Sequence, residues 1–198
     1  MSTRSPDVTA DFDPITIALQ VARQLDALGI ADTVGGSIAA SFAGEPRSTL
    51  DIDIVAALTE AQIPALVADL EREFYVDAAA LRRAVRDRSS ANLIHQSSQL
   101  KVDLFVAGGT PLDEQQLARR QPVDVGNGQT LYLHPPEDIL LQKLRWYRKG
   151  GETSDRQWRD ILGIIRVQRD RLDRSYLAAG ATVIDVADLL DRAVRDAS

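Results

Sequence analysis

The sequence contains no cysteine, which excludes a disulfide framework and any zinc site built from cysteine. Histidine is almost as scarce, with two residues in a chain of 198, so a histidine-rich metal centre is not expected. A metal bound by this chain would have to be held mainly by oxygen atoms. Oxygen ligands favour Mg²⁺ or Mn²⁺ over softer metals.

Long hydrophobic runs are also missing, since no stretch approaches the roughly 20 apolar residues that span a bilayer. The N-terminal stretch is polar and lacks the apolar core of a signal peptide. We therefore expect a cytoplasmic protein that makes no membrane contact. Residues 1–13 are expected to form a flexible N-terminal arm.

The length of 198 residues and the hydrophobic content of 44% suit one compact domain, or a core domain with a smaller helical appendage. The net charge is −6, but the segment 143–174 carries ten basic residues and only five acidic ones. Such a basic segment can guide a polyanion to one side of a protein. Solvated helix faces with salt bridges explain the same pattern equally well.

The spacing of apolar residues alternates between helical and strand periods along the chain. Helices are expected over 15–28, 37–42, 59–74, 77–88, 112–120, 136–148, 155–169, 173–179 and 182–195. Strands are expected over 31–34, 50–58, 91–95, 100–106, 123–125 and 131–133. This order predicts an α/β (α+β) fold, with a small mixed β-sheet core flanked by helices over 14–134 and a C-terminal helical bundle over 135–198.

Two acidic residues, Asp51 and Asp53, lie two positions apart on the expected strand 50–58. Side chains at that spacing share one face of a strand, so the two carboxylates repel each other and attract a cation. A solvated strand face is the alternative. Asp103 lies on the strand 100–106 and becomes informative if that strand is adjacent. The three acids would then suit a pair of metal ions that serve in-line phosphoryl displacement.

A glycine turn, Gly35-Gly36-Ser37, precedes the short helix 37–42. The N-terminus of a helix offers free N–H groups to an anion, and glycine lets the backbone approach it closely. The Ser37 hydroxyl can donate a hydrogen bond to a phosphate or cap the helix. A Gly-Gly-Ser turn is common by itself, but its position ahead of the acid pair favours a phosphate site.

This combination resembles the nucleotidyltransferase fold of the DNA polymerase β superfamily. A Gly-Ser helix start, an Asp-x-Asp strand and a later single Asp match over about residues 30–106, and the segment 47–53 resembles the second motif. The resemblance implies transfer of a nucleoside monophosphate from an NTP such as ATP to an acceptor hydroxyl, with release of pyrophosphate. It implies that Mg²⁺ (or Mn²⁺) is bound by Asp51, Asp53 and Asp103. It also implies that the nucleotide phosphates are bound by Gly35, Gly36 and Ser37.

A second resemblance covers residues 136–144 and 156–161, which are similar to the helical half of AbiEii-type nucleotidyltransferases, the toxins of type IV toxin–antitoxin systems and their relatives. It implies that Lys143 and Asp160 complete the nucleotide site, and it makes an antitoxin a possible partner. From the residues alone, Lys143 could instead extend to solvent. Asp160 could instead pair with a neighbouring arginine on its own helix.

The acceptor is left open by these patterns, because RNA, a protein hydroxyl and a small molecule of the antibiotic type all suit the same core. A non-catalytic nucleotide-binding or regulatory module of this fold is a further alternative, and so is a plain α/β interaction domain. The two tryptophans, Trp146 and Trp158, are expected to pack the two long helices together.

Overall fold

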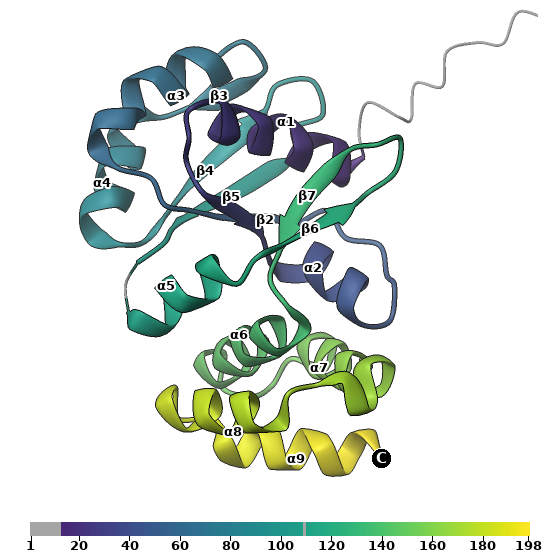
Figure 1. The fold of residues 1–198 in the computed structure, drawn as a ribbon. Helices are drawn as coiled ribbons and strands as arrows, with labels where there is room; N and C mark the ends of the chain where they lie inside the picture. Colours follow the sequence, from purple (N-terminus) through teal and green to yellow (C-terminus); the bar gives the residue numbers. More distant parts are fainter. Residues whose placement is uncertain (1–12, 109) are drawn as a thin grey trace, which may run out of the picture.

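A seven-stranded mixed sheet forms the centre of the protein in the computed structural model, which describes residues 13–108 and 110–198 (Figure 1). The strand order is β3-β4-β5-β2-β1-β7-β6. The strands are β1 (Asp32–Val34), β2 (Ile52–Ala56), β3 (Phe74–Val76), β4 (Ser90–His95), β5 (Lys101–Val106), β6 (Gln121–Asp124) and β7 (Thr130–Leu133). The N-terminal arm expected over 1–13 lies almost entirely outside the described residues.

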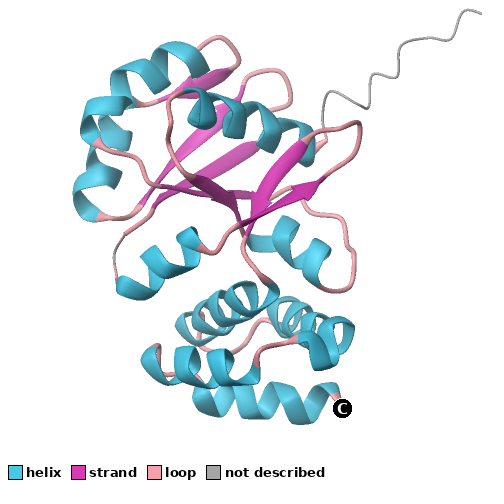
Figure 2. Cartoon of the chain, in the orientation of Figure 1, coloured by secondary structure: helices cyan, strands magenta, loops and turns pink. Residues whose placement is uncertain are grey.

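The helices of the first part of the chain are α1 (Pro14–Ala27), α2 (Gly36–Ala43), α3 (Ile63–Leu70), α4 (Ala78–Asp87) and α5 (Pro111–Ala118). After β7 the described chain is entirely helical, with α6 (Pro136–Lys149), α7 (Asp155–Gln168), α8 (Arg174–Val183) and α9 (Ala187–Ala197). The expected α/β fold with a helical C-terminal region is therefore confirmed (Figure 2). None of the helices in the described ranges is both long and apolar enough to cross a membrane.

The two faces of the sheet are covered differently. Helices α1, α3 and α4 lie on one face, whereas α2, α5 and the C-terminal helices lie on the other side (Figure 1). Alternate residues of β2 are buried, with Ile52 and Ile54 at 1% and 0% exposure, because they point into the core. The residues between them point to the opposite face. The sheet therefore has an apolar face that supports the fold and a second face that carries polar side chains.

Helix α2 contacts α6 and α7, so the C-terminal helices pack directly against the helix that connects β1 to β2. Glycines make this close packing possible. A methyl group on Gly44 would lie 2.8 Å from the backbone nitrogen of Ile164, and one on Gly163 would lie 3.3 Å from the backbone nitrogen of Glu45. The C-terminal helices are thus held close to the loop that leads into β2.

Some expected elements were wrong in extent. The break expected between the helices 173–179 and 182–195 lies at 184–186, because α8 continues to Val183. The helix expected over 59–74 begins as a 3₁₀ turn, η2 (Glu60–Gln62), ends at Leu70, and gives way to the edge strand β3. The capping box between Thr59 and Gln62 is present as the sequence indicates. The apolar run of β3 suits either period, and antiparallel pairing with β4, which places Phe74 opposite His95, makes it a strand.

Asp32 is a buried acid at the start of the central strand β1, with 4% of its surface exposed. Its Oδ2 atom has no hydrogen-bond partner among the described residues. Burial raises the pKa of Asp32 to about 7, against an opposing effect of the nearby Arg120. The folded protein therefore retains a proton here that the unfolded chain releases near pH 3.8.

This burial predicts a specific pH dependence of stability. Because the folded state binds the proton more tightly, the contribution of Asp32 should fall as the pH rises from 3.8 to about 7 and then level off. Asp32→Asn should remove this fall, so that the variant is more stable than the wild type at pH 8 and closer to it at pH 4. Thermal unfolding across this pH range measures the effect, with Asp69→Asn, at an exposed position on α3 that does not act on Asp32, as the control. Equal pH profiles of wild type and Asp32→Asn would contradict the prediction.

Candidate active site

Two carboxylates meet on the polar face of the sheet. Strands β2 and β5 are parallel, and their register places Asp53 directly opposite Asp103. Direct partners on adjacent strands point to the same face, so these two acids lie side by side. Burial raises the pKa of Asp53, and the charges of Asp103 and Asp51 raise it further. A site that resists a second negative charge in this way favours a bound cation.

The third acid, Asp51, is exposed and immediately precedes β2. Asp103 has a cation partner already, since the Nζ atom of Lys101 lies 2.7 Å from its Oδ2 atom. Among the described residues, no three acidic or histidine side chains are gathered into a ready-made metal site. The donor set of carboxylate oxygens nevertheless suits Mg²⁺ or Mn²⁺. Lys101 occupies one of the two Asp103 oxygens, so a metal at this carboxylate would compete with its ammonium group.

The glycine turn lies against Asp53. The N–H of Gly35 donates to the backbone oxygen of Asp53 at 2.8 Å. Gly36 has φ +55°, and a methyl group there would lie 1.7 Å from Oδ2 of Asp53. The carboxylate thus rests against the N-terminus of α2, where the partial positive charge of the helix is favourable. Only glycine permits this approach.

Ser37 faces a cationic network instead of capping α2, because Gly35 is the N-cap and makes no side-chain capping bond. An Nη2 group of Arg47 donates to the Ser37 hydroxyl. Arg47 also binds Asp160 with two hydrogen bonds, of 2.8 Å from Nε and 2.9 Å from Nη2. Arg47 is therefore a site residue to which no role was assigned from sequence. Its place at the head of the segment 47–53 was the available signal.

Lys143 and Asp160 are brought together as the second motif implies, with 2.7 Å between Lys143 Nζ and Asp160 Oδ2. Their side chains are 10% and 7% exposed, so Lys143 does not extend to solvent. Burial alone raises the pKa of Asp160, but the hydrogen bonds from Arg47 and Lys143 outweigh it and hold the pKa below its usual value. One carboxylate thus holds two cations. The charge of Lys143 also acts on Asp53 and opposes the rise in its pKa.

Comparison with known proteins gives no match at the level of sequence families. No protein-family model matches the chain. No curated protein gives a significant sequence match either.

Solved structures give clear matches. An antigenic nucleotidyltransferase-like protein from Paracoccidioides brasiliensis superposes with a TM-score of 0.57 at 21% identity, over 92% of this chain and 92% of that chain. The antibiotic-resistance factor ANT(2″)-Ia matches with a TM-score of 0.53 at 13% identity, over 93% of this chain and 96% of that chain. The same factor in complex with adenylyl-2″-tobramycin gives 0.54 at 11% identity, over 86% and 96%.

The chain has a nucleotidyltransferase fold. The expected nucleotidyltransferase fold is therefore confirmed, and similarity at these identities extends to the fold alone. Within this fold, the predicted residues Gly35, Gly36 and Asp53 lie in contact, as do Lys143 and Asp160. Asp103 joins the first group through its place beside Asp53.

The expectation for the tryptophans holds for one of the two. Trp158 packs against Tyr147, with ring centroids 5.0 Å apart, and so joins α7 to α6. Trp146 is 48% exposed, and its ring lies 6.3 Å from that of Phe105 on β5. The expectation that Trp146 packs the two helices together was wrong, because its position on α6 turns it toward the polar face of the sheet.

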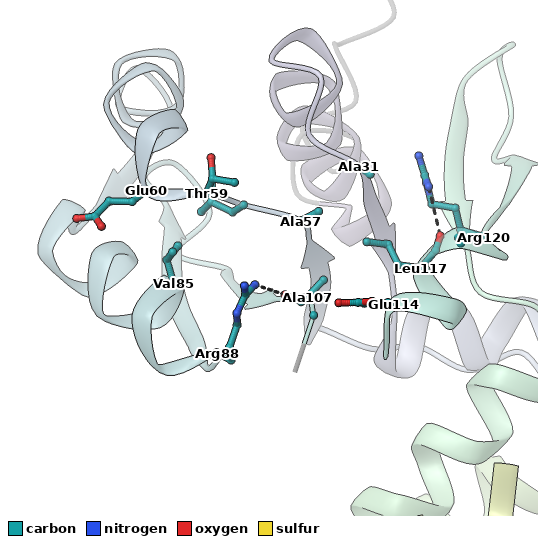
Figure 3. A pocket seen from close by; sticks show the side chains of 13 residues that line it. Ala31, Ala57, Thr59, Glu60, Val85, Arg88, Ala107, Glu114, Leu117 and Arg120 are labelled. Carbon is teal, nitrogen blue, oxygen red and sulfur yellow. Dashed lines mark hydrogen bonds between the residues drawn. The ribbon is translucent and has the colours of Figure 1, made fainter. Parts of the chain in front are cut away.

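A cavity of about 600 Å³ lies elsewhere in this nucleotidyltransferase fold (Figure 3). It is lined by Ala57, which follows β2, and therefore lies at the opposite end of that strand from Asp51. Its arginines bind backbone oxygens, since Arg88 donates to Ala107 at 2.6 Å and Arg120 donates to Leu117 at 3.2 Å. None of the predicted site residues lines it, so the candidate chemistry belongs to the acid-bearing end.

The close contact at Gly36 predicts the effect of adding one methyl group. Gly36→Ala has to displace the Asp53 carboxylate and also strain a backbone with φ +55°. Gly29→Ala is the matched control, because it meets the same strain at φ +66° with no atom within 4 Å. The strained backbone should lower the free energy of unfolding of both variants by about 1 kcal/mol. The clash with Asp53 should lower that of Gly36→Ala further. Urea unfolding measures the two free energies. Equal losses would contradict the close contact between Gly36 and the Asp53 carboxylate.

The Asp160 network predicts a larger effect. Asp160→Asn leaves the buried Lys143 and its partner Arg47 without a carboxylate, so unfolding free energy should fall by about 3 kcal/mol at pH 7. The carboxylate has a lowered pKa, so its stabilisation is present above the unfolded value of 3.8 and is lost as the pH falls through the folded value. The difference between wild type and variant should therefore shrink in acid. Asp155→Asn, exposed on the same helix, is the control, and an equal loss there would contradict the assignment.

Proposed function

We propose that this protein is a nucleotidyltransferase that moves a nucleoside monophosphate from an NTP to an acceptor hydroxyl and releases pyrophosphate. The observation that carries the proposal is the pair Asp53 and Asp103, which are direct partners on adjacent strands beside the Gly36 turn. Two adjacent carboxylates can hold a metal ion, and a helix N-terminus can bind a phosphate group. Nucleotidyl transfer uses both.

The triphosphate would lie on the β1 side of Asp53, where the turn follows β1 and α2 begins. Gly35, Gly36 and Ser37 would bind its terminal phosphates. Arg47 and Lys143 are already held together by Asp160 at this place. Binding of the phosphates would therefore need little rearrangement of cations, and this preorganisation supports catalysis by electrostatics and positioning.

The carboxylates Asp51, Asp53 and Asp103 would hold Mg²⁺ or Mn²⁺, and such ions neutralise phosphate charge and activate an oxygen nucleophile when bound. Lys101 would release Asp103 in that state. Its ammonium group now supplies the positive charge that Asp103 needs beside Asp53. Lys101 received no role from sequence reasoning, although it shares a strand face with Asp103 two residues further on.

The acceptor would approach from the other side, because β5 flanks β2 on the edge away from β1. Asp103 would accept the proton of the acceptor hydroxyl. The acceptor oxygen then forms a bond to the α-phosphorus, and the bond from that phosphorus to the pyrophosphate oxygen breaks. The acids are all present, which favours an enzyme over a non-catalytic module of the same fold.

The AbiEii-type assignment and its antitoxin partner form the finer part of this proposal. They rest on the residues 136–144 and 156–161, and the ion pair between Lys143 and Asp160 supports that part of the motif. A small-molecule acceptor of the antibiotic type is the alternative, since ANT(2″)-Ia shares the fold. These alternatives differ in the acceptor and leave the roles of the acids unchanged.

Incubation with each labelled NTP, Mg²⁺ and separate pools of total RNA, protein and hydroxylated antibiotics tests the proposal. The wild type should label one pool, and Asp53→Asn and Asp103→Asn should lower the rate at least about 100-fold. Both should remain folded, because removing one of two neighbouring carboxylates relieves repulsion. Asp69→Asn, an exposed acid on α3, should keep full activity. Labelling that survives in Asp53→Asn, or absence of labelling in every pool, would overturn the proposal.

A further inference from the structure

The polar face of the sheet continues beyond Asp103 onto strand β4. The register of β4 and β5 places Asn92 opposite Asp103 and Ser90 opposite Phe105. Asn92 and Ser90 are exposed, and direct partners share a face, so both side chains lie on the acid face. A strip of amide, hydroxyl and aromatic groups thus extends from the acids, on the side where the acceptor would enter.

Trp146 forms a wall beside this strip. It is 48% exposed, and its ring is tilted by 57° from that of Phe105. It follows Lys143 by three residues on α6, so the two side chains lie on neighbouring positions of the helix surface. Trp146 therefore lies between Lys143, which would bind the triphosphate, and the strip of polar side chains where the acceptor would bind.

Positive charge gathers at the same end of the helices. The Nζ atom of Lys149 lies 4.9 Å from the centre of the Trp146 ring. Helices α6 and α7 form a hairpin in which Lys143 is paired with Asp160, so Arg156, one turn before Asp160, lies toward the Lys149 end. Within the described residues, Lys149 and Arg156 take part in none of the observed ion pairs, and both are exposed.

We propose that this surface binds the 3′ end of single-stranded RNA as the acceptor. The terminal base stacks on the Trp146 face that Lys149 now covers. Lys149 moves off the ring and, with Arg156, contacts the phosphates that precede that base. An exposed aromatic ring among unpaired cations is the usual means of holding a single strand without reading its sequence. Asn92, beside Asp103, offers an amide to the ribose 2′-hydroxyl, the group that distinguishes RNA from DNA. The transfer step rests on the proposed function, whereas the binding does not.

Binding of a short RNA oligonucleotide tests this surface. The oligonucleotide carries a fluorophore at its 5′ end and has an unmodified 3′ end, and NTP and metal are left out of the assay. Stacking of one base contributes about 1–3 kcal/mol, so Trp146→Leu should raise the Kd by roughly 10-fold or more. Trp158→Phe is the matched control and should bind as the wild type does, because Trp158 packs against Tyr147 inside the helical region. In Trp158→Phe, the remaining tryptophan fluorescence should be quenched by the RNA.

Salt dependence tests the phosphate contacts separately. Lys149→Gln should reduce the slope of log K against log salt by about 0.7, as expected for one phosphate contact on a single strand. Arg82→Gln removes an exposed charge from α4 on the other face of the sheet and should leave the slope unchanged. An equal decrease in both variants would show general attraction to the protein and would overturn the proposed contact.

The outcomes separate this inference from the proposed function. Binding of RNA that depends on Trp146, without labelling from any NTP, would retain the RNA surface and reject the transferase. Labelling of a small molecule or a protein, with no binding of RNA, would retain the transferase and reject the RNA surface. Equal binding of a matched DNA strand, or a Kd unchanged in Trp146→Leu, would also overturn the inference.

Discussion

The parallel pairing of β2 with β5 is the constraint on which the rest of the site depends, because it places Asp53 and Asp103 side by side although they are far apart in sequence. The apolar residues between the acids fix this register, since Ile52 and Ile54 must enter the core. A shift of the pairing by one residue would turn these isoleucines to the polar face and the acids into the core. The same burial that stabilises the sheet therefore aims the carboxylates.

A second constraint links the core to the helical region. Asp160 on α7 holds Lys143 of α6 and Arg47 of the loop before β2, so three segments share one carboxylate. The contacts of Gly44 and Gly163 bring these segments close enough for the network to form. The cations consequently lie beside the glycine turn before any ligand is present. The site is thus assembled by folding, with Lys101 balancing the charge of Asp103.

The sequence predicted much of this arrangement, for identifiable reasons. The alternation of apolar and polar residues around Asp53 and Asp103 indicated the face that these two acids share, and the capping box of Thr59 and Gln62 marked a helix start that the structure has. Long-range partners were beyond reach. Arg47 and Asp160 are distant in sequence, and only the packing of α2 on α7 brings them together. The exposure of Trp146 was missed for the same reason, because helical spacing alone does not say which neighbour a face meets.

The central claim is that Asp51, Asp53 and Asp103 form a metal-dependent nucleotide site. The most direct measurement is a crystal structure with Mn²⁺ and a non-hydrolysable NTP analogue, using anomalous scattering to locate the metal. The account predicts Mn²⁺ bound by these carboxylates, Lys101 moved away from Asp103, and the terminal phosphates at Gly36 and Lys143. An intact pair of Lys101 and Asp103 with the nucleotide or the metal bound elsewhere would contradict it.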